Sequence, residues 1–179
     1  MAGAAMMATP ATQARQDVSI TLAVDAASIA AVKSLFLDYL RFVEGFLGES
    51  LSFQNTEAEF RDFPAGYDGL FLARVNDRPA GAVGFKPFSP RAAELKRLWV
   101  APAARGRGLG EALIRAAIRA ARADGYCCML LDTDPGLAHA NRIYERMGFR
   151  DVESYYPNPR GGRSRYMRLD FGPPSPLAS

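Results

Sequence analysis

Three glycines in the segment 94–110, ELKRLWVAPAARGRGLG, form the part of the chain best suited to chemistry. An apolar strand runs into a loop that contains Gly106, Gly108 and Gly110, and a helix begins where the loop ends. The first N–H groups of a helix have no partner inside it and lie at the positive end of its dipole. Because glycines let a ligand approach the backbone closely, the loop predicts a cradle for a phosphate or pyrophosphate group. A plain strand-to-helix turn is the alternative.

Two familiar phosphate motifs do not fit this loop. A P-loop ends in Gly-Lys-Ser/Thr, whereas Gly110 is followed by Glu111 and Ala112. A dinucleotide-binding G-x-G-x-x-G would need glycine where Glu111 or Leu113 stands. The spacing that does fit is Arg-x-x-Gly-x-Gly, which begins at Arg105.

That spacing, between a strand and a helix, resembles the acyl-CoA pyrophosphate loop of the GNAT superfamily of acyl-CoA-dependent N-acetyltransferases. A second segment, AHANRIYERMGF at 138–149, is similar to the family's fourth helix and the strand after it. The resemblance extends from about Val18 to Phe171. It implies a single acyl-CoA N-acyltransferase domain of α/β class (an α+β mixed sheet), with a splay between the fourth and fifth strands. It also implies acetyl-CoA as co-substrate and no metal.

The resemblance places coenzyme A in the splay, which here would lie between residues 98–100 and 130–132. The backbone of the earlier strand would pair with the pantetheine arm, and the N–H groups of the glycine loop would hold the pyrophosphate. Arg107 would either reach a phosphate of the 3′-phospho-ADP end or remain solvated. The cofactor-binding residues implied are Leu98, Trp99, Val100, Arg105, Gly106, Arg107, Gly108, Leu109, Gly110, Asn141 and Tyr144.

Three catalytic residues follow from the same resemblance: Tyr144, Val100 and Glu94. Tyr144 would hydrogen-bond or protonate the departing thiolate, although it also fits the core face of its helix. Asn141, three residues earlier and so on the same side of the helix, would bond the pantetheine or cap a turn. The Val100 N–H would be the donor to the oxyanion. The mechanism implied is direct attack in a ternary complex.

Glu94 is the first candidate for the general base, because several family members place a glutamate at the start of this strand. Strand alternation puts Glu94, Lys96 and Leu98 on one face and Leu95, Arg97 and Trp99 on the other. An ordinary Glu94–Lys96 ion pair is the alternative interpretation. Asp132 and Tyr155 are weaker candidates for the base.

The acceptor side would be built from residues 35–61 and 155–168. Aromatic side chains there would line an apolar pocket or belong to the core: Phe42, Phe46, Phe53, Tyr67, Tyr155 and Tyr156. Four arginines would favour an acceptor with a carboxylate or phosphate, or form a solvated face: Arg160, Arg163, Arg165 and Arg168.

The periodicity of apolar residues predicts the elements that must position these groups. Strands are expected at 18–24, 70–75, 80–85, 94–100, 127–132, 149–156 and 164–171. Helices are expected from an Asp25 cap to Gly45 or Gly48, at 56–63 with Thr56 and Glu59 at capping-box spacing, at 109–123, and at 137–147 with Asp134 as cap. The order is β-α-α-β-β-β-α-β-α-β-β.

Composition excludes several other classes of protein. The 179 residues are 49% hydrophobic, with a formal net charge of +3, two Cys and one His, so a disulfide framework or a Cys/His zinc site is excluded. No run approaches the roughly 20 apolar residues of a membrane span. We expect residues 17–172 to form the domain, 1–16 and 173–179 to be tails, and the location to be cytoplasmic. Cys127 and Cys128 are expected to be strand residues, and His139 a surface residue.

Three functions remain open, in order of preference. The first is an N-acetyltransferase that acts on a small-molecule or protein amine, with a homodimer as one possible assembly. The second is a non-catalytic domain of the same fold that binds or senses acyl-CoA. The third is a nucleic-acid binder that uses Arg115, Arg119 and Arg122, for which a charge of +3 is thin support. We therefore expect neither a nucleic acid nor a membrane as partner.

Overall fold

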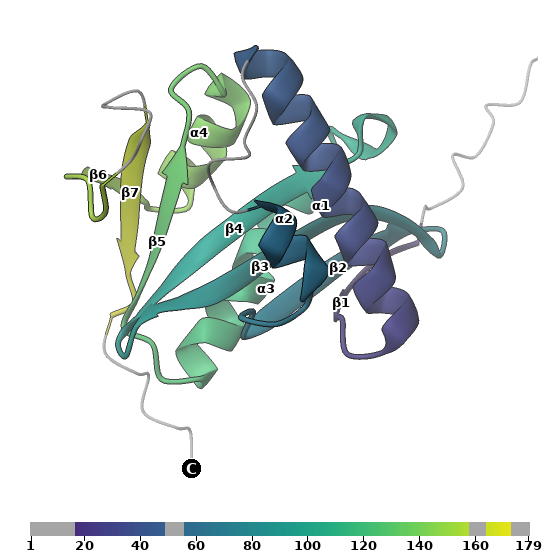
Figure 1. Cartoon of the computed structure of the whole chain (residues 1–179), viewed down its shortest axis with the longest axis horizontal. Helices are drawn as coiled ribbons and strands as arrows, with labels where there is room; N and C mark the ends of the chain where they lie inside the picture. The colour runs from purple at the N-terminus through teal and green to yellow at the C-terminus, as the bar shows by residue number, and fades with distance from the viewer. Residues whose placement is uncertain (1–16, 49–55, 158–163, 173–179) are drawn as a thin grey trace, which may run out of the picture.

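The computed structural model describes residues 17–48, 56–157 and 164–172, which form a mixed sheet with helices on both faces (Figure 1). The order of elements and the mixed sheet match the expectation from the sequence, so the predicted fold class is confirmed. In chain order the elements are β1 (Val18–Leu22), α1 (Ala26–Leu47), α2 (Thr56–Arg61), β2 (Gly69–Val75), β3 (Arg78–Ser89), β4 (Ala92–Val100), the 3-10 helix η2 (Pro102–Ala104), α3 (Leu109–Ala123), β5 (Cys128–Thr133), α4 (Ala138–Arg146), β6 (Arg150–Val152) and β7 (Arg165–Asp170).

The strands lie in the order β1-β2-β3-β4-β5-β7-β6. Every neighbouring pair is antiparallel except β4 and β5, which run parallel. Strands β2 and β3 are joined through Asn76 and Asp77, which have φ values of 49° and 60°. Two residues with positive φ are typical of the tight hairpin turns that match strand twist. The single parallel pair therefore falls in the middle of the sheet, where the chain crosses over through α3.

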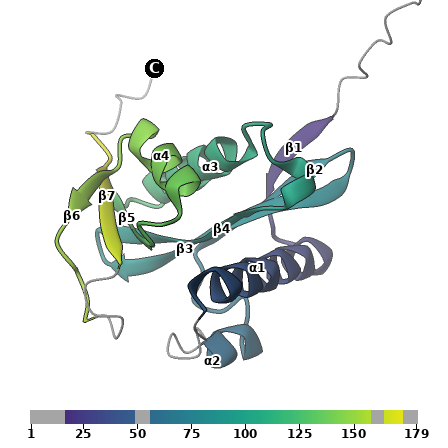
Figure 2. The same cartoon turned by 90° about the horizontal axis from the view of Figure 1, so that it is seen from above.

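Helices cover the two faces of the sheet separately, with α1 and α2 on one face and α3 and α4 on the other (Figure 2). Each face has its own apolar core. Under α3 and α4, the buried residues include Phe85, Leu113 and Met129. Under α1 and α2, they include Phe36 and Leu72. The sheet is thus buried on both sides, and any opening between two of its strands connects the two faces.

Two helix caps differ in their outcome. The Asp25 carboxylate accepts a hydrogen bond from the Ser28 N–H at 2.9 Å, so the predicted cap of α1 is confirmed. The predicted cap of α4 is wrong, because the N-cap is Leu137 and makes no side-chain bond. Asp134 instead accepts from the Gly136 N–H at 2.8 Å, which closes a local Asx turn before the helix begins.

Candidate active site

Strands β4 and β5 separate after a short parallel ladder. Their paired residues are Ala92 with Cys128, Ala93 with Met129 and Glu94 with Leu130. Beyond these pairs β4 continues to Val100 and β5 to Thr133 without pairing, and Figure 1 shows the two strands diverging. The splay expected between the fourth and fifth strands is therefore confirmed. A cavity of about 690 Å³ is lined by both strand ends and by residues of α1, α3 and α4.

A β-bulge at Arg97 changes which side chains of β4 face each layer. Ala82 is opposite Trp99 and Gly84 is opposite Lys96, so Val83 faces two residues of β4 instead of one. Arg97 has a φ of 57°, in the left-handed region that non-glycine residues rarely occupy. The extra residue reverses the alternation beyond it.

The predicted grouping of Leu95, Arg97 and Trp99 on one face is therefore wrong. Leu95 packs in the core under α3, whereas Trp99 packs in the core under α1. Leu98 and Val100 pack at the α3 side. The bulge therefore reverses which face of the sheet the side chains at the end of β4 point to.

The backbone of Val100 faces the splay. The Ala101 N–H donates to the Ala80 carbonyl at 2.9 Å. Hydrogen-bonded and non-hydrogen-bonded pairs alternate along an antiparallel ladder, so the pair Val100–Gly81 is non-hydrogen-bonded. The N–H and C=O of Val100 therefore point away from β3, toward β5. This is the orientation that an oxyanion donor or a pantetheine partner needs.

Arg105 lies on the α1 side of the cavity rather than in front of the glycine loop. Its Nε donates to the Val100 carbonyl at 3.1 Å, and its guanidinium lies 5.0 Å from the Trp99 ring and 5.7 Å from the Phe42 ring. No carboxylate among the described residues pairs with it. Its charge is thus held at the cavity wall by a backbone oxygen and two aromatic faces.

The glycine loop leaves open space in front of the α3 N-terminus. Gly106 and Gly108 have φ values of 76° and 73°, and a Cβ on either would meet nothing within 4 Å. Gly108 is the N-cap of α3, without a side-chain cap. The Glu111 carboxylate, in the first turn, is directed to Arg146 at 2.5 Å. Backbone N–H groups and open space therefore fit the diphosphate of coenzyme A.

Two residues assigned to this loop lie differently from the rest. A Cβ at Gly110 would lie 3.4 Å from Cδ1 of Ile143, so this glycine faces α4. Arg107 is exposed, does not line the cavity, and its Nη2 lies 3.4 Å from the Ala103 carbonyl. Gly106, Gly108 and Leu109 do line the cavity.

Tyr144 is buried on α4 and lines the cavity. Burial, followed by the nearby Tyr39 and Asp132, raises the pKa of its hydroxyl far above the usual value. The hydroxyl has no hydrogen-bond partner among the described residues, so it is a protonated donor available to a ligand. The ring packs against Phe149 at 5.9 Å, which means that Tyr144 also belongs to the core, as the sequence allowed.

Asn141 caps the turn before α4 and does not line the cavity. Its Nδ2 donates to the carbonyls of Asp134 at 3.0 Å and Pro135 at 3.2 Å. Its Oδ1 is buried without a partner in the described part of the chain. Of the two roles the sequence left open, the structure places the side chain in the turn-capping position.

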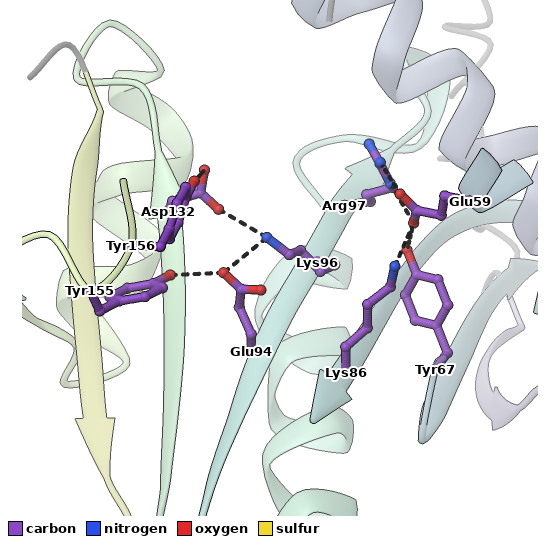
Figure 3. A network of polar contacts seen from close by, with 9 residues as sticks. All are labelled: Glu59, Tyr67, Lys86, Glu94, Lys96, Arg97, Asp132, Tyr155 and Tyr156. Atoms are coloured by element: carbon purple, nitrogen blue, oxygen red, sulfur yellow. Dashed lines mark hydrogen bonds and ion pairs between the residues drawn. The ribbon is translucent and has the colours of Figure 1, made fainter. Parts of the chain in front are cut away.

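Two charged clusters flank β4 on either side (Figure 3). The acidic cluster comprises Glu94, Lys96 and Asp132 with Tyr155 and Tyr156. Lys96 Nζ lies 2.9 Å from Glu94 Oε1 and 3.2 Å from Asp132 Oδ1. Tyr155 donates to Glu94 and Tyr156 to Asp132, each at 3.0 Å.

The Lys96 ammonium lies between the two carboxylates of the acidic cluster. Burial disfavours the charged form of Lys96, but the attraction of Asp132 and Glu94 outweighs it and raises the lysine's pKa. Burial, and then the Glu94 charge, raises the pKa of Tyr155. Asp132 lines the cavity, whereas Glu94 and Lys96 do not. Glu94 lies at the last rung of the parallel ladder and is linked to Asp132 through Lys96.

The basic cluster comprises Glu59, Lys86 and Arg97 with Tyr67, and sequence reasoning did not find it. Arg97 Nη2 lies 2.5 Å and Lys86 Nζ 3.1 Å from the Glu59 carboxylate, and Tyr67 donates to it at 2.5 Å. Burial would raise the pKa of Glu59, but hydrogen bonds from Arg97 and Tyr67 and the charges of Arg97 and Lys86 lower it to about 2. The Glu59 carboxylate is thus bonded to Arg97, while the Thr56 side chain of the predicted capping box lies outside the described residues.

The remaining acceptor-side candidates separate into three groups. Phe42 and Phe46 line the cavity and are 40% and 48% exposed, so both are open to a ligand. Arg165 is paired with Asp151 and Glu145, and Arg168 with Asp170, so those two arginines are internally neutralised. Phe53, Arg160 and Arg163 lie outside the described residues.

Cys127, Cys128 and His139 take no part in the clusters. Cys128 is a buried residue of β5, and Cys127 precedes that strand with its sulfur 3.1 Å from Arg91 Nη2. His139 is exposed, as expected, on the first turn of α4. In the described residues, no helix is both long enough and apolar enough to cross a membrane.

The chain belongs to the Acetyltransferase (GNAT) family, whose model matches residues 29–149. It is 36% identical over 155 residues to an uncharacterized N-acetyltransferase of Schizosaccharomyces pombe, covering 80% of this chain and 94% of that protein. A Salmonella typhimurium acetyltransferase structure with its cofactor acetyl-CoA has a TM-score of 0.63 and 20% identity, over 90% of this chain and 99% of the other. The ribosomal-protein-S18-alanine N-acetyltransferase of Escherichia coli has a TM-score of 0.62 and 20% identity, over 86% and 94%.

Proposed function

We propose that the protein is an N-acetyltransferase that transfers an acetyl group from acetyl-CoA to a primary amine by direct attack in a ternary complex. The family membership supports acetyl transfer in general. The single observation that carries the finer proposal is the end of the parallel ladder at Glu94 and Leu130. Beyond it, one cavity is lined by Val100 and by Tyr144, whose hydroxyl has no hydrogen-bond partner among the described residues.

The residues would divide the work as follows. Acetyl-CoA would supply the acyl group as a thioester with a thiol leaving group. The N–H groups at the start of α3, with Gly106 and Gly108, would hold its diphosphate. The Val100 N–H would donate to the acyl oxygen, where negative charge develops. Tyr144 would donate a hydrogen bond from its protonated hydroxyl to the thiolate that leaves as the C–S bond breaks, and water would be excluded by the aromatic walls of the cavity.

The acceptor amine must lose a proton as its nitrogen forms the C–N bond and the C–S bond breaks. For a lysine-like amine with a pKa of ~10.4, deprotonation at pH 7 costs roughly 4.6 kcal/mol, against about 1.4 kcal/mol for an α-amine near ~8. The proton would go to the carboxylate pair of the acidic cluster. We propose Asp132 as the member that meets the amine, because it lines the cavity, with Glu94 coupled to it through Lys96.

The proposal is tested with a panel of small amines and peptide amines, each supplied with acetyl-CoA and with longer acyl-CoAs. Release of free thiol that depends on the amine supports an N-acetyltransferase. Calorimetric binding of acetyl-CoA without turnover of any amine would favour the second candidate, an acyl-CoA-sensing domain. The unpartnered, protonated hydroxyl of Tyr144 at the cavity wall is the observation that favours the enzyme over the sensor.

A further inference from the structure

The acidic and basic clusters are immediate neighbours. Lys86 of the basic cluster and Glu94 of the acidic cluster are cross-strand partners on β3 and β4. Lys96 and Arg97, one from each cluster, are consecutive residues of β4. Directly opposite residues of an antiparallel pair have Cβ atoms about 5 Å apart. The two clusters are therefore adjacent on the sheet, and Figure 3 shows them side by side along β4.

Each cluster carries one charge in excess, and the signs are opposite. The acidic cluster has two carboxylates and one ammonium, while the basic cluster has one carboxylate with the cations of Lys86 and Arg97. All six charged side chains are at least partly buried, with exposures between 6% and 27%. Because water screens partly buried charges weakly, the excess on each side acts on a bound ligand.

Both clusters reach the same cavity. Asp132 contributes one wall and Arg97 another. Arg105, which also lines the cavity, has no carboxylate partner among the described residues. Next to it lie the exposed rings of Phe42 and Phe46, stacked with their centroids 6.3 Å apart. The cavity therefore offers an anionic wall, a cationic wall and an apolar aromatic wall together.

We propose that the acceptor is a zwitterion, namely a free amino acid or a related amine with a carboxylate a few bonds from its nitrogen. The ammonium is drawn to the acidic cluster, whose carboxylates, Asp132 and Glu94, would also take its proton. The carboxylate is drawn to Arg97 and Arg105, which line the cavity. Lys86 does not line it and acts from behind Arg97, by neutralising the Glu59 carboxylate that Arg97 shares with it. An apolar side chain packs on the aromatic wall. This inference rests on the proposed function, since it names the acceptor class for that reaction.

The test compares several amino acids with their amides, including L-phenylalanine, L-phenylalaninamide and phenethylamine. We expect kcat/KM for each acid to exceed that for its amide by at least about tenfold, because a charged hydrogen bond is worth about 1.5–3 kcal/mol. The amide's amine loses its proton more easily than that of the acid. A preference for the acid therefore cannot arise from amine basicity.

Variants test whether the basic cluster causes this preference for the acid. Lys86→Met should lower the ratio of kcat/KM for the acid to kcat/KM for the amide, and Lys86→Arg should keep it. Arg119→Met, which removes an exposed cation of α3, should leave the ratio unchanged. Equal turnover of acids and amides, or an unaltered ratio in Lys86→Met, would overturn the inference and leave the proposed function standing. Failure to acetylate any amine would overturn the proposed function instead. In that case, calorimetry on the protein with bound coenzyme A compares the affinities of L-phenylalanine and L-phenylalaninamide. Equal affinities would refute the zwitterion inference separately from the proposed function.

Discussion

The Arg97 guanidinium is bound to the Glu59 carboxylate by two hydrogen bonds, of 3.2 Å from Nε and 2.5 Å from Nη2, across 38 residues of sequence. Arg97 is the residue whose left-handed backbone forms the bulge in β4. Such a conformation costs of order 1–3 kcal/mol and persists only where its surroundings fix it. Helix α2 thereby sets the direction in which the end of β4 faces the splay.

Replacing Glu59 with Gln should destabilise the fold by about 3 kcal/mol, because the buried guanidinium loses its counter-ion. The pH dependence follows from the pKa of about 2 in the folded protein, below the usual value of 4.5. A lowered pKa stabilises the fold above pH 4.5, and that contribution is lost as the pH falls toward 2. Urea unfolding of wild type between pH 7 and 2.5 should show this loss. A Glu59→Gln variant with the same acid sensitivity as wild type would contradict the assignment.

Replacing Gly108 with Leu should weaken acetyl-CoA binding by more than about tenfold, since the new side chain occupies the open space of the cradle. Gly125, at the other end of α3, offers a matched control because its φ of 89° is also left-handed and its surroundings are equally open. Gly125→Leu should share the backbone penalty of about 1–2 kcal/mol but bind acetyl-CoA normally. Calorimetry with acetyl-CoA measures both, and similar affinities in the two variants would refute the cradle.

Replacing Tyr144 with Phe should lower kcat by about a hundredfold while leaving acetyl-CoA affinity nearly unchanged. Activity persists because a thiol with a pKa near ~8.5 is a tolerable leaving group without an acid. Since the pKa of Tyr144 is raised, its hydroxyl stays protonated and produces no fall in rate up to about pH 9. Thiol release is the measurement, and Tyr126→Phe is the control, because the Tyr126 hydroxyl is bonded to Asp68 and the residue does not line the cavity. Unchanged turnover in the Tyr144 variant at every pH would remove this residue from the mechanism.

Replacing Asp132 with Asn should lower kcat/KM by about a hundredfold or more, because the side-chain amide cannot accept the proton of the amine. Glu94→Gln should have the smaller effect if it acts through Lys96. Lys96→Met removes the cation that links the two carboxylates and should lower kcat/KM. Lys96→Arg, which keeps the charge, should largely restore the activity. Wild-type kcat/KM in both Asp132→Asn and Glu94→Gln would place the base elsewhere.

Sequence reasoning recovered the fold because its signals are local. The glycine spacing, the α1 cap and the apolar periodicity each depend on residues within one turn or strand of one another. It misplaced the α4 cap because the Asx turn of Asp134 competes with capping over the same few residues. It also predicted too long a strand at 149–156, because β6 ends at Val152.

The clusters around the site were harder to predict. The bulge at Arg97 reverses strand alternation and depends on Glu59, which is distant in sequence, so no local pattern reveals it. Glu94 and its ion pair with Lys96 could be anticipated from their spacing on β4. The bond of Asp132 to Lys96 could not, because it depends on how far β5 diverges from β4.

In the described residues, the parallel ladder of three residue pairs and the adjoining hydrogen bond from the Cys127 N–H to the Arg91 carbonyl join the backbone of β1–β4 to that of β5, β7 and β6. Acetyl-CoA bound between these two parts of the sheet would form hydrogen bonds with backbone groups of β4 that β5 leaves unpaired. Binding of acetyl-CoA and the stability of the association between the two parts are therefore thermodynamically linked. Native-state hydrogen exchange should register this directly. Amides of β4 beyond Glu94 and of β5 beyond Leu130 should exchange markedly more slowly once the thioester is bound, while those of β2 remain as they were.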